Sequence, residues 1–267
     1  MTLMPYPYVS VFRATEESLL KYGSRNVNLA QIHAALDQYK VFAHRVLTDE
    51  VCFSILVDVV FYSGFRAATV TEKLPVIKRH FPAIDIVADY GHQDIDRILA
   101  DKEMIRHEGK IKACVKNAQA IKQLIQKHGS FSLYLASFKP TESEKNLQAL
   151  KRDLQRQFSY ISKVTSYHLL TDFGFDVLKP DLVICRIFKR LGIINDEGDL
   201  LEVIRQGRMF AEATKLPIRY IDIVFVAYGQ VQSNEMGVDR GICLKVPRCG
   251  FCGLTVFCEW YKNIHAH

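Results

Sequence analysis

The sequence contains no apolar run that reaches the roughly 18 residues needed to span a bilayer. Its first residues also lack the basic segment and apolar core of a secretory signal, so we expect neither a membrane anchor nor export. It has no internal repeat, no low-complexity tract and no Asn-Gly hairpin signal. These absences favour a cytosolic or nuclear protein.

The composition is that of an ordinary globular protein. Apolar residues make up 49% of the chain and charged residues 24%, which excludes a disordered or collagen-like protein. The 267 residues suffice for one large domain or two small ones. Lysine and arginine number 35 against 29 aspartate and glutamate, so the net charge of +6 permits a polyanionic partner without requiring one.

Helical periodicity dominates the pattern of apolar residues. Between 105 and 128 they recur every three or four positions, and Gly129 follows as a helix C-cap. The same spacing predicts helices, or helix pairs, over 50–68, 70–81, 92–99, 145–157 and 159–191. Residues 218–230 fit a buried strand or a buried helix. The chain is therefore predicted to be all-α.

Cysteine is the residue type with the most informative distribution. A secreted disulfide scaffold would spread an even set along the chain, but this chain has seven cysteines. Four of them lie within one short C-terminal stretch: Cys243, Cys249, Cys252 and Cys258. Four thiolates this close can surround one metal centre, and both zinc and a [4Fe–4S] cluster accept four thiolates. The other three, Cys52, Cys114 and Cys185, lie on apolar helix faces and are predicted core residues.

The C-terminal stretch resembles a known loop. Residues 247–252, followed by Cys258 and Glu259, are similar to the iron–sulfur loop of the endonuclease III branch of the helix-hairpin-helix DNA glycosylases. This chain has five residues between its first two cysteines, where that branch has six. The resemblance implies a structural [4Fe–4S] cluster on the four cysteines and a loop that contacts DNA. Lys245 and Arg248 would then meet phosphates.

A second segment resembles the hairpin and catalytic aspartate of the same superfamily. Residues 158–166 occupy the hairpin position, with Tyr160 and Ser162 in place of its two glycines, and Asp181 opens the matching segment DLVICRIFKRLG. Two helices that meet at a tight turn expose backbone N–H groups to a phosphate. The resemblance implies DNA-binding roles for Ser159, Ser162, Lys163, Thr165 and Arg186.

Asp181 is the candidate catalytic residue. Base excision passes through an oxocarbenium-like sugar, so a nearby carboxylate can stabilise the developing positive charge and orient the attacking water. An aspartate between Pro180 and a helical pattern is also a typical N-cap, and one residue can do both. Bifunctional members carry a lysine nucleophile where this chain has Val164, so we expect hydrolysis without an efficient lyase step.

Residues 105–118 resemble a different relative, the bacterial 3-methyladenine DNA glycosylase I, through IRHEGKI and the later Asn-Ala pair. Residues 129–138 and 192–196 continue this likeness. The glutamate and tryptophan that recognise the base in that enzyme align with Val59 and Ala67, so its pocket does not transfer. The zinc ligands of that enzyme have no match either. The candidate base-pocket residues here are Asp58, Tyr62 and Phe65, because a flipped base needs stacking and edge contacts.

Together the resemblances, which cover residues 50–262, imply a two-lobed helical HhH-GPD glycosylase fold with a C-terminal [4Fe–4S] loop. We expect a helical N-terminal segment over 1–49 that packs on the second lobe, a lobe with the base pocket over 50–157, the hairpin and aspartate over 158–240, and the cluster loop and tail over 241–267.

The function expected from the resemblances is that of a monomeric, monofunctional DNA glycosylase. It would bind double-stranded DNA, flip a damaged or mispaired base and hydrolyse its N-glycosidic bond, with an alkylated purine such as 3-methyladenine as the leading substrate. Three alternatives stay open. The enzyme could act on another base, such as adenine, mispaired uracil or thymine, or an oxidised or modified base. The fold could bind lesions without catalysis, or the cysteines could form a zinc ribbon.

Overall fold

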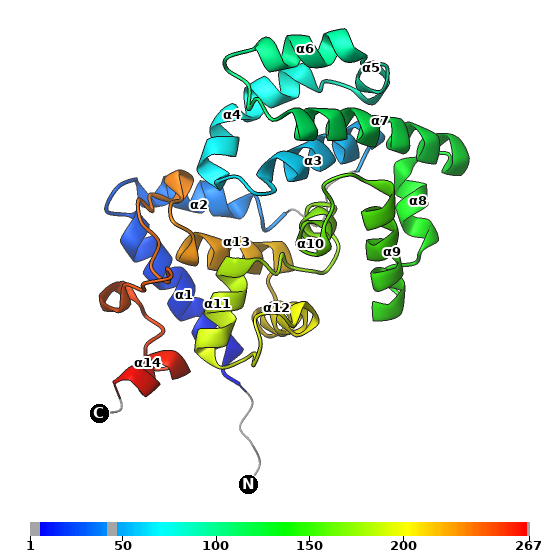
Figure 1. Cartoon of the computed structure of the whole chain (residues 1–267). Helices are drawn as coiled ribbons and strands as arrows, with labels where there is room; N and C mark the ends of the chain where they lie inside the picture. Colours follow the sequence, from blue (N-terminus) through cyan, green and yellow to red (C-terminus); the bar gives the residue numbers. More distant parts are fainter. Residues whose placement is uncertain (1–5, 42–46, 266–267) are drawn as a thin grey trace. The chain divides into compact units, whose positions relative to one another are not determined.

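The computed structural model describes residues 6–41 and 47–265, and these residues form helices joined by short loops (Figure 1). Within these ranges no strand is formed, and Ser233 and Val238 make an isolated bridge. No helix within the same ranges is long and apolar enough to cross a membrane. The prediction of an all-α fold is confirmed.

The chain divides into two compact units, which we describe separately. Unit 1 comprises residues 1–45 and 176–267, and unit 2 comprises residues 46–175. The helices of unit 1 are α1 (Tyr8–Gly23), α2 (Leu29–Asp37), α11 (Leu182–Leu191), α12 (Leu200–Thr214), α13 (Ile218–Gly229), the 3₁₀ turns η2 (Asn234–Met236) and η3 (Cys249–Phe251), and α14 (Glu259–Ile264). The helices of unit 2 are α3 (Asp49–Tyr62), α4 (Ala67–His80), α5 (Ile84–Ala88), α6 (His92–Ala100), α7 (Glu108–His128), α8 (Phe131–Ser137), α9 (Glu144–Gln157) and α10 (Lys163–Asp172).

Unit 2 is built around α7, which packs against α3, α5, α6 and α8. Ile111, Ala118 and Ile121 form a fully buried stripe along it, and burial of an isoleucine side chain contributes about 1.5–3 kcal/mol. Gly129 ends the helix with a φ of +90°, a conformation that favours glycine. The predicted helix over 105–128 is therefore confirmed, although it begins three residues later.

The helix predicted over 50–68 is divided in the structure. Helix α3 ends at Tyr62 because Gly64 adopts a φ of +78°, and α4 then begins at Ala67. Apolar residues on both sides of this turn hide the break from a periodicity argument, since a glycine within a helical pattern does not by itself end a helix.

Unit 1 is built around α13, which packs against α1, α2, α11 and α12. Because α13 is covered on most sides, its sequence is apolar all round and shows no helical stripe. This is why residues 218–230 fitted both a strand and a helix. Phe188, Phe210 and Phe225 form the centre of the core, with ring centroids 5.0–5.5 Å apart.

Candidate functional site

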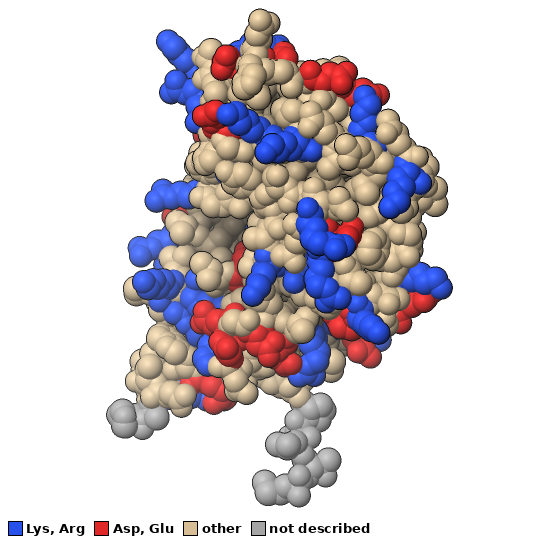
Figure 2. All heavy atoms as spheres, turned by 45° about the vertical axis from the view of Figure 1, so that its right-hand side comes forward, with Lys and Arg blue, Asp and Glu red and all other residues tan. Residues whose placement is uncertain are grey.

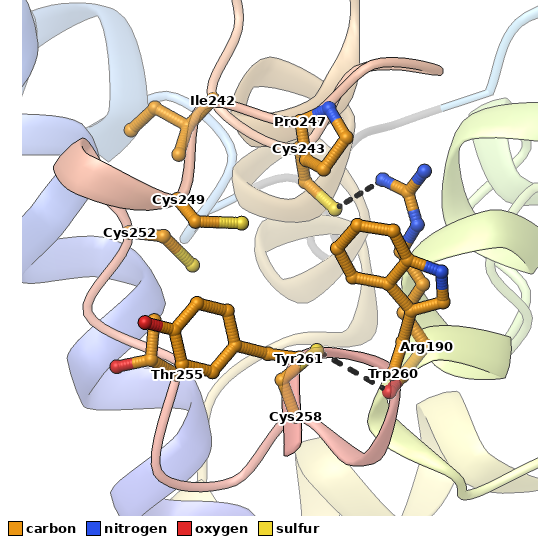
Figure 3. A pocket seen from close by; sticks show the side chains of 10 residues that line it. All are labelled: Arg190, Ile242, Cys243, Pro247, Cys249, Cys252, Thr255, Cys258, Trp260 and Tyr261. Atoms are coloured by element: carbon orange, nitrogen blue, oxygen red, sulfur yellow. Dashed lines mark hydrogen bonds between the residues drawn. The ribbon is translucent and has the colours of Figure 1, made fainter. Parts of the chain in front are cut away.

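The four C-terminal cysteines line one cavity in unit 1. The cavity has about 280 Å³ of empty space that is partly open to solvent, and Arg190, Trp260 and Tyr261 complete its wall. Figure 3 shows Cys249 and Cys252 pointing into this space from one side, with the sulfurs of Cys243 and Cys258 facing it from two others. The pattern of cysteines in the sequence therefore corresponds to a real convergence of side chains.

Backbone hydrogen bonds fix the loop that carries these cysteines. The N–H groups of Ile242 and Cys243 both donate to the carbonyl of Tyr228, at 2.8 and 3.0 Å, so the loop is attached to the end of α13. The N–H of Arg248 returns to the carbonyl of Ile242 at 2.9 Å, which closes the first part of the loop. The cysteines are thus held before any metal is considered.

Two polar side chains direct hydrogen bonds at the sulfurs. Arg190 Nη1 lies 3.2 Å from Cys243 Sγ, and the Tyr228 hydroxyl donates to Cys252 Sγ at 3.0 Å. Burial raises the pKa of the Cys243 thiol, whereas the guanidinium of Arg190 opposes this change. Within residues 6–41 and 47–265, no three His, Cys, Asp or Glu side chains form a group that could hold a metal ion.

Asp181 is the N-cap of α11. Its Oδ1 accepts hydrogen bonds from the N–H groups of Val183 and Ile184, at 2.8 and 3.1 Å. The other oxygen, Oδ2, lies 3.8 Å from the ammonium of Lys179, and the side chain is 20% exposed. One oxygen therefore holds the helix end, while the second oxygen lies near the ammonium of Lys179 and the side chain is partly exposed, so the capping role leaves room for a chemical one.

A second aspartate fixes the turn that precedes Asp181. Asp222 is only 1% exposed, and its Oδ1 accepts the N–H of Lys179 at 2.8 Å while Oδ2 pairs with Arg219. Burial raises the pKa of Asp222, and the Arg219 guanidinium opposes this rise. The sequence argument did not identify Asp222, because it lies in the apolar α13 and far along the chain from the turn that it supports.

Arg186, a predicted DNA-binding residue, donates to three backbone carbonyls within unit 1. The acceptors are Gly229 at 2.7 Å, Cys243 at 3.1 Å and Leu182 at 3.5 Å. These bonds join α11, the end of α13 and the cysteine loop. The guanidinium therefore has a structural role, and its predicted contact with DNA stays a prediction.

The two basic residues predicted on the cysteine loop differ in their surroundings. Lys245 is exposed, and its carbonyl accepts a hydrogen bond from Arg190 at 2.8 Å. Arg248 is half-buried, and its Nη1 donates to the Tyr22 hydroxyl at 2.5 Å and to the carbonyl of Arg240 at 2.8 Å. Lys245 is thus free to reach a phosphate, while Arg248 is already oriented by α1.

The predicted hairpin in unit 2 is a helix–turn–helix formed by α9 and α10. Tyr160 lies in the turn with a φ of +64°, the left-handed conformation that favours glycine. Ser162 and Thr165 form a capping box at the start of α10, with Ser162 N–H donating to Thr165 Oγ1 at 2.5 Å. The turn forms without glycine because the cap and the packing of Tyr160 hold it.

The remaining predicted residues of the hairpin have distinct environments. The backbone of Ser159 is paired with the amide of Asn117, by bonds of 2.8 and 3.2 Å, which attaches the turn to α7. Lys163 is exposed on the first turn of α10. The hydroxyl of Thr165 donates to the carbonyl of Tyr160 at 3.1 Å. Among the predicted hairpin residues, including Ser162, Lys163 is the one with an exposed charged group.

The three candidate base-pocket residues lie at the end of α3 and in the loop after it. The hydroxyl of Tyr62 is hydrogen-bonded to Thr71 Oγ1 at 2.9 Å, and Asp58 Oδ2 lies 3.7 Å from the ammonium of Lys78. Phe65 is 37% exposed. These positions are compatible with a pocket at the loop between α3 and α4, which stays a prediction.

A buried lysine fixes this loop, and the sequence argument missed it. Lys110 is 2% exposed, and its ammonium donates to the carbonyls of Val60 and, at 2.6 Å, Ser63, at the end of α3. The ammonium also lies 5.3 Å from the ring centre of Phe65 and 4.9 Å from that of Tyr160. Burial lowers the pKa of Lys110 to about 8. One side chain thus connects the predicted pocket loop with the hairpin turn.

A spacing argument could have found Lys110. It precedes Cys114 and Ala118 by one and two turns of α7, and both of these residues are completely buried. A lysine on such a stripe has to be satisfied by polar groups inside the protein.

The structure therefore brings the predicted residues together in two sets. Unit 1 holds Asp181 and the four cysteines, and unit 2 holds the hairpin and the candidate pocket residues. Figure 2 shows lysine and arginine side chains spread over one face of the molecule in several groups, with acidic side chains between them.

Comparison with solved structures identifies the fold. Endonuclease III, in a trapped covalent intermediate with DNA, is similar over 88% of this chain and 97% of its own, with a TM-score of 0.53 and 17% identity. The 3-methyladenine DNA glycosylase I of Staphylococcus aureus matches 48% of this chain and 78% of its own, with a TM-score of 0.44 and 23% identity. A variant of 3-methyladenine DNA glycosylase I bound to 3-methyladenine matches 47% and 77%, with a TM-score of 0.42 and 24% identity. The likeness to endonuclease III shows that the helices have an all-helical fold similar to that of this enzyme.

Comparison with protein families identifies the enzyme class. The sequence profile of the family described as methyladenine glycosylase matches residues 38–199. This range contains the whole of unit 2 and extends through α11, so it includes both the hairpin and Asp181. The chain belongs to the methyladenine glycosylase family, and it is a DNA N-glycosylase.

Proposed function

We propose that the protein is a monofunctional DNA glycosylase that removes a damaged base, with alkylated purines such as 3-methyladenine as its substrates. The observation that carries the proposal is the family match over residues 38–199, within which Asp181 caps a helix with one oxygen and has a side chain that is 20% exposed. The relative in complex with 3-methyladenine supports an alkylated purine as the first substrate to test.

In this proposal Asp181 is the catalytic residue. Because Oδ1 is fixed by two backbone N–H groups, the carboxylate has a defined orientation. The carboxylate stabilises positive charge that develops on the sugar as the N-glycosidic bond breaks, and it orients the water that completes hydrolysis. Asp222 is a positioning residue, since it holds the N–H of Lys179 in the preceding turn.

The hairpin, the loop after α3 and the cysteine loop supply the contacts to DNA. We assign phosphate contacts to the turn at Ser159–Ser162 and to Lys163 and Lys245, whose charged groups are exposed. Asp58, Tyr62 and Phe65 contact the flipped base. Residues 50–157 thus provide the base pocket, 158–240 the hairpin and the aspartate, 241–267 the cluster loop, and 1–49 a helical support. The protein acts as a monomer on double-stranded DNA, in a nucleoid or a nucleus.

The absence of a lyase step follows from the hairpin. Val164, an apolar residue, stands where bifunctional enzymes have the nucleophilic lysine, and the neighbouring Lys163 is one position away on α10. Adjacent residues on a helix point in directions about 100° apart. Treatment with borohydride during turnover should therefore trap no covalent complex with DNA, and a trapped complex would contradict this part of the proposal.

We propose that the four cysteines hold a [4Fe–4S] cluster. The four side chains line one cavity, and Arg190 and Tyr228 direct hydrogen bonds at two of the sulfurs, which would stabilise thiolate ligands. When bound, the cluster would crosslink the loop and serve as structural support. Arg186 and Arg190 connect this loop to α11, the helix that Asp181 caps.

The metal is tested by elemental analysis of the purified protein. We expect iron and acid-labile sulfide in equal amounts, with a broad visible absorption. The variant Cys252→Ser should lose most of the iron, whereas Cys185→Ala, which changes a buried cysteine in the same unit, should retain it. Stoichiometric zinc without iron would support the zinc-ribbon alternative instead.

Activity is tested with methylated DNA and with duplexes that each carry one altered base. We expect release of 3-methyladenine and a single-turnover rate that falls at least about 100-fold in Asp181→Asn. The matched control is Asp199→Asn, since Asp199 caps α12 in the same unit through the N–H of Glu202 and asparagine also caps helices. Its rate should stay within about twofold of wild type.

The same experiment separates the alternatives. Release of adenine, uracil or an oxidised base, with methylated purines left intact, would show that this other base is the substrate. The proposed role of Asp181 would not change. If the wild-type protein and Asp181→Asn both bind lesion DNA and neither releases a base, the protein is a lesion-binding module.

A further inference from the structure

A second hollow lies in unit 1, between the end of α1 and the cysteine loop. It has about 540 Å³ of space that is open to solvent, and its walls come from Ser18, Lys21, Tyr22 and Arg25 on one side and from the backbone-rich segment 250–253 on the other. A Cβ atom added at Gly250 would meet nothing within 4 Å, so this wall is open for a ligand to approach.

Positive charge is concentrated in this hollow. Lys21 and Arg25 line it and are exposed, and Arg248 lies beside it. The guanidinium carbons of Arg25 and Arg248 lie 4.9 and 4.5 Å from the ring centre of Phe251, so two like charges share one aromatic side chain. Because like charges repel one another, an anion bound near both guanidinium groups would stabilise the arrangement.

An acidic side chain beside Arg248 is already engaged. Asp239 Oδ1 accepts the hydroxyl of Tyr22 at 2.7 Å, and the same hydroxyl accepts a hydrogen bond from Arg248. This chain of hydrogen bonds orients Arg248, and the pKa of Asp239 is lowered first by the Tyr22 hydroxyl. Among the described residues, the side chains of Lys21 and Arg25 make no ion pair with a carboxylate.

The two walls are joined so that the hollow has a fixed shape. The N–H of Gly253 donates to Ser18 Oγ at 3.0 Å, and a Cβ at Gly253 would lie 2.4 Å from that oxygen. Only glycine therefore permits this approach of the loop to α1. Neither wall lies within residues 38–199, so the hollow is an addition to the part of the chain that matches the methyladenine glycosylase family.

We propose that this hollow binds a phosphate of the DNA backbone, through Lys21, Arg25 and Arg248, and so extends the DNA interface onto the N-terminal helix. Arginine guanidinium groups suit this role because they donate several hydrogen bonds to phosphate oxygens, and the Phe251 ring holds two of them in place. The contact is with the backbone, so it adds affinity without base preference. The inference rests on the proposed function, and it assigns to residues 1–49 a part in DNA binding.

The test is the salt dependence of binding to a lesion-free duplex, measured by fluorescence anisotropy. Each lost phosphate contact lowers the slope of log Kd against log salt by about 0.9, so Lys21→Ala/Arg25→Ala, which removes two of the three cations around the one phosphate, should lower it by about 0.9 and weaken binding several-fold near physiological salt. Arg25→Ala alone should lower the slope by less, because Lys21 and Arg248 remain beside the phosphate. The matched control is Arg13→Ala, which removes an exposed cation from the same helix without touching the hollow.

Two further measurements separate binding from folding and from catalysis. Lys21 lies in the last turn of α1, where a cation also stabilises the helix dipole, so the melting temperature of each variant is recorded. Base release at limiting protein should fall in Lys21→Ala/Arg25→Ala in step with its loss of affinity, whereas Arg13→Ala should release the base as the wild type does.

The proposal is overturned if the double variant has the slope of Arg13→Ala, or if it binds normally and releases the base more slowly. The salt dependence is measured with lesion-free DNA, so it tests this proposal even if the protein has no glycosylase activity.

Discussion

Two groups of aromatic rings and cations in this protein use the same chemistry for different purposes. In unit 2, Lys110 lies between Phe65 and Tyr160 and donates to two carbonyls, so its charge is satisfied within the protein. In unit 1, Arg25 and Arg248 lie against Phe251 at an open hollow. Both groups contain cation–ring contacts, so burial rather than the type of contact distinguishes a cation that stabilises a loop from one that is available to bind a ligand.

The largest effect on stability is expected from Lys110→Met, which removes the buried cation between Phe65 and Tyr160. Two carbonyls at the end of α3 lose their donor, so the free energy of unfolding should fall by about 2–4 kcal/mol in urea titrations. The control is Lys112→Met on the same helix, where the lysine is exposed and paired with Glu108, and its effect should stay within about 0.5 kcal/mol. Equal losses in the two variants would show that burial does not distinguish them.

The pH dependence of the unfolding free energy, measured for wild type and Lys110→Met, tests the same comparison. The pKa of Lys110 is about 8 in the folded protein against 10.5 for an ordinary lysine. Between these values the unfolded chain binds a proton that the folded protein has lost, so raising the pH stabilises the folded state. The difference in unfolding free energy between wild type and Lys110→Met should therefore grow from pH 8 to 10.5. A constant difference would mean that burial does not shift this lysine.

A smaller effect is expected from Phe251→Ala in the open group. The ring is 40% exposed, so the free energy of unfolding should change by less than about 1 kcal/mol. Affinity for lesion-free DNA should fall about threefold to tenfold, because Arg25 and Arg248 lose the ring that holds them. Val256→Ala removes an exposed apolar side chain from the same loop and should leave affinity unchanged. A large loss of stability without loss of affinity would show that Phe251 and its two arginines have a structural role, as Lys110 does.

The smallest effect is expected from Tyr22→Phe. It removes the hydroxyl between Arg248 and Asp239, which should lower the free energy of unfolding by about 0.5–1 kcal/mol. Affinity for DNA should stay within about twofold, since Arg248 keeps its bond to the Arg240 carbonyl and its contact with Phe251. If Tyr22→Phe lowers the affinity as much as Phe251→Ala does, the Tyr22 hydroxyl rather than the Phe251 ring orients Arg248.

Features that depend on spacing could be predicted from the sequence. The periodicity of 105–128 gave α7, the spacing of the cysteines gave their common cavity, and Cys52, Cys114 and Cys185 are buried as expected. These succeed because one turn of helix or one short loop brings the residues together.

Features that depend on partners from distant segments could not be predicted. Asp222 supports the turn before Asp181, and Arg190 lies against Cys243, across long separations in the chain. The left-handed Tyr160 was hidden for a related reason, because the residues that hold it come partly from α7. Tertiary contacts override local preference at such positions.

The division of unit 1 into 1–45 and 176–267 has a consequence for synthesis on the ribosome. Unit 2 is continuous, so it can fold as soon as it has emerged. Helix α1 is made before unit 2, but the loop that bears Gly253 and contacts this helix is made after unit 2. Assembly of the cysteine cavity therefore follows the synthesis of both units' other helices, and a chain that stops before Gly253 would leave the Ser18 hydroxyl of α1 without the N–H group that donates to it.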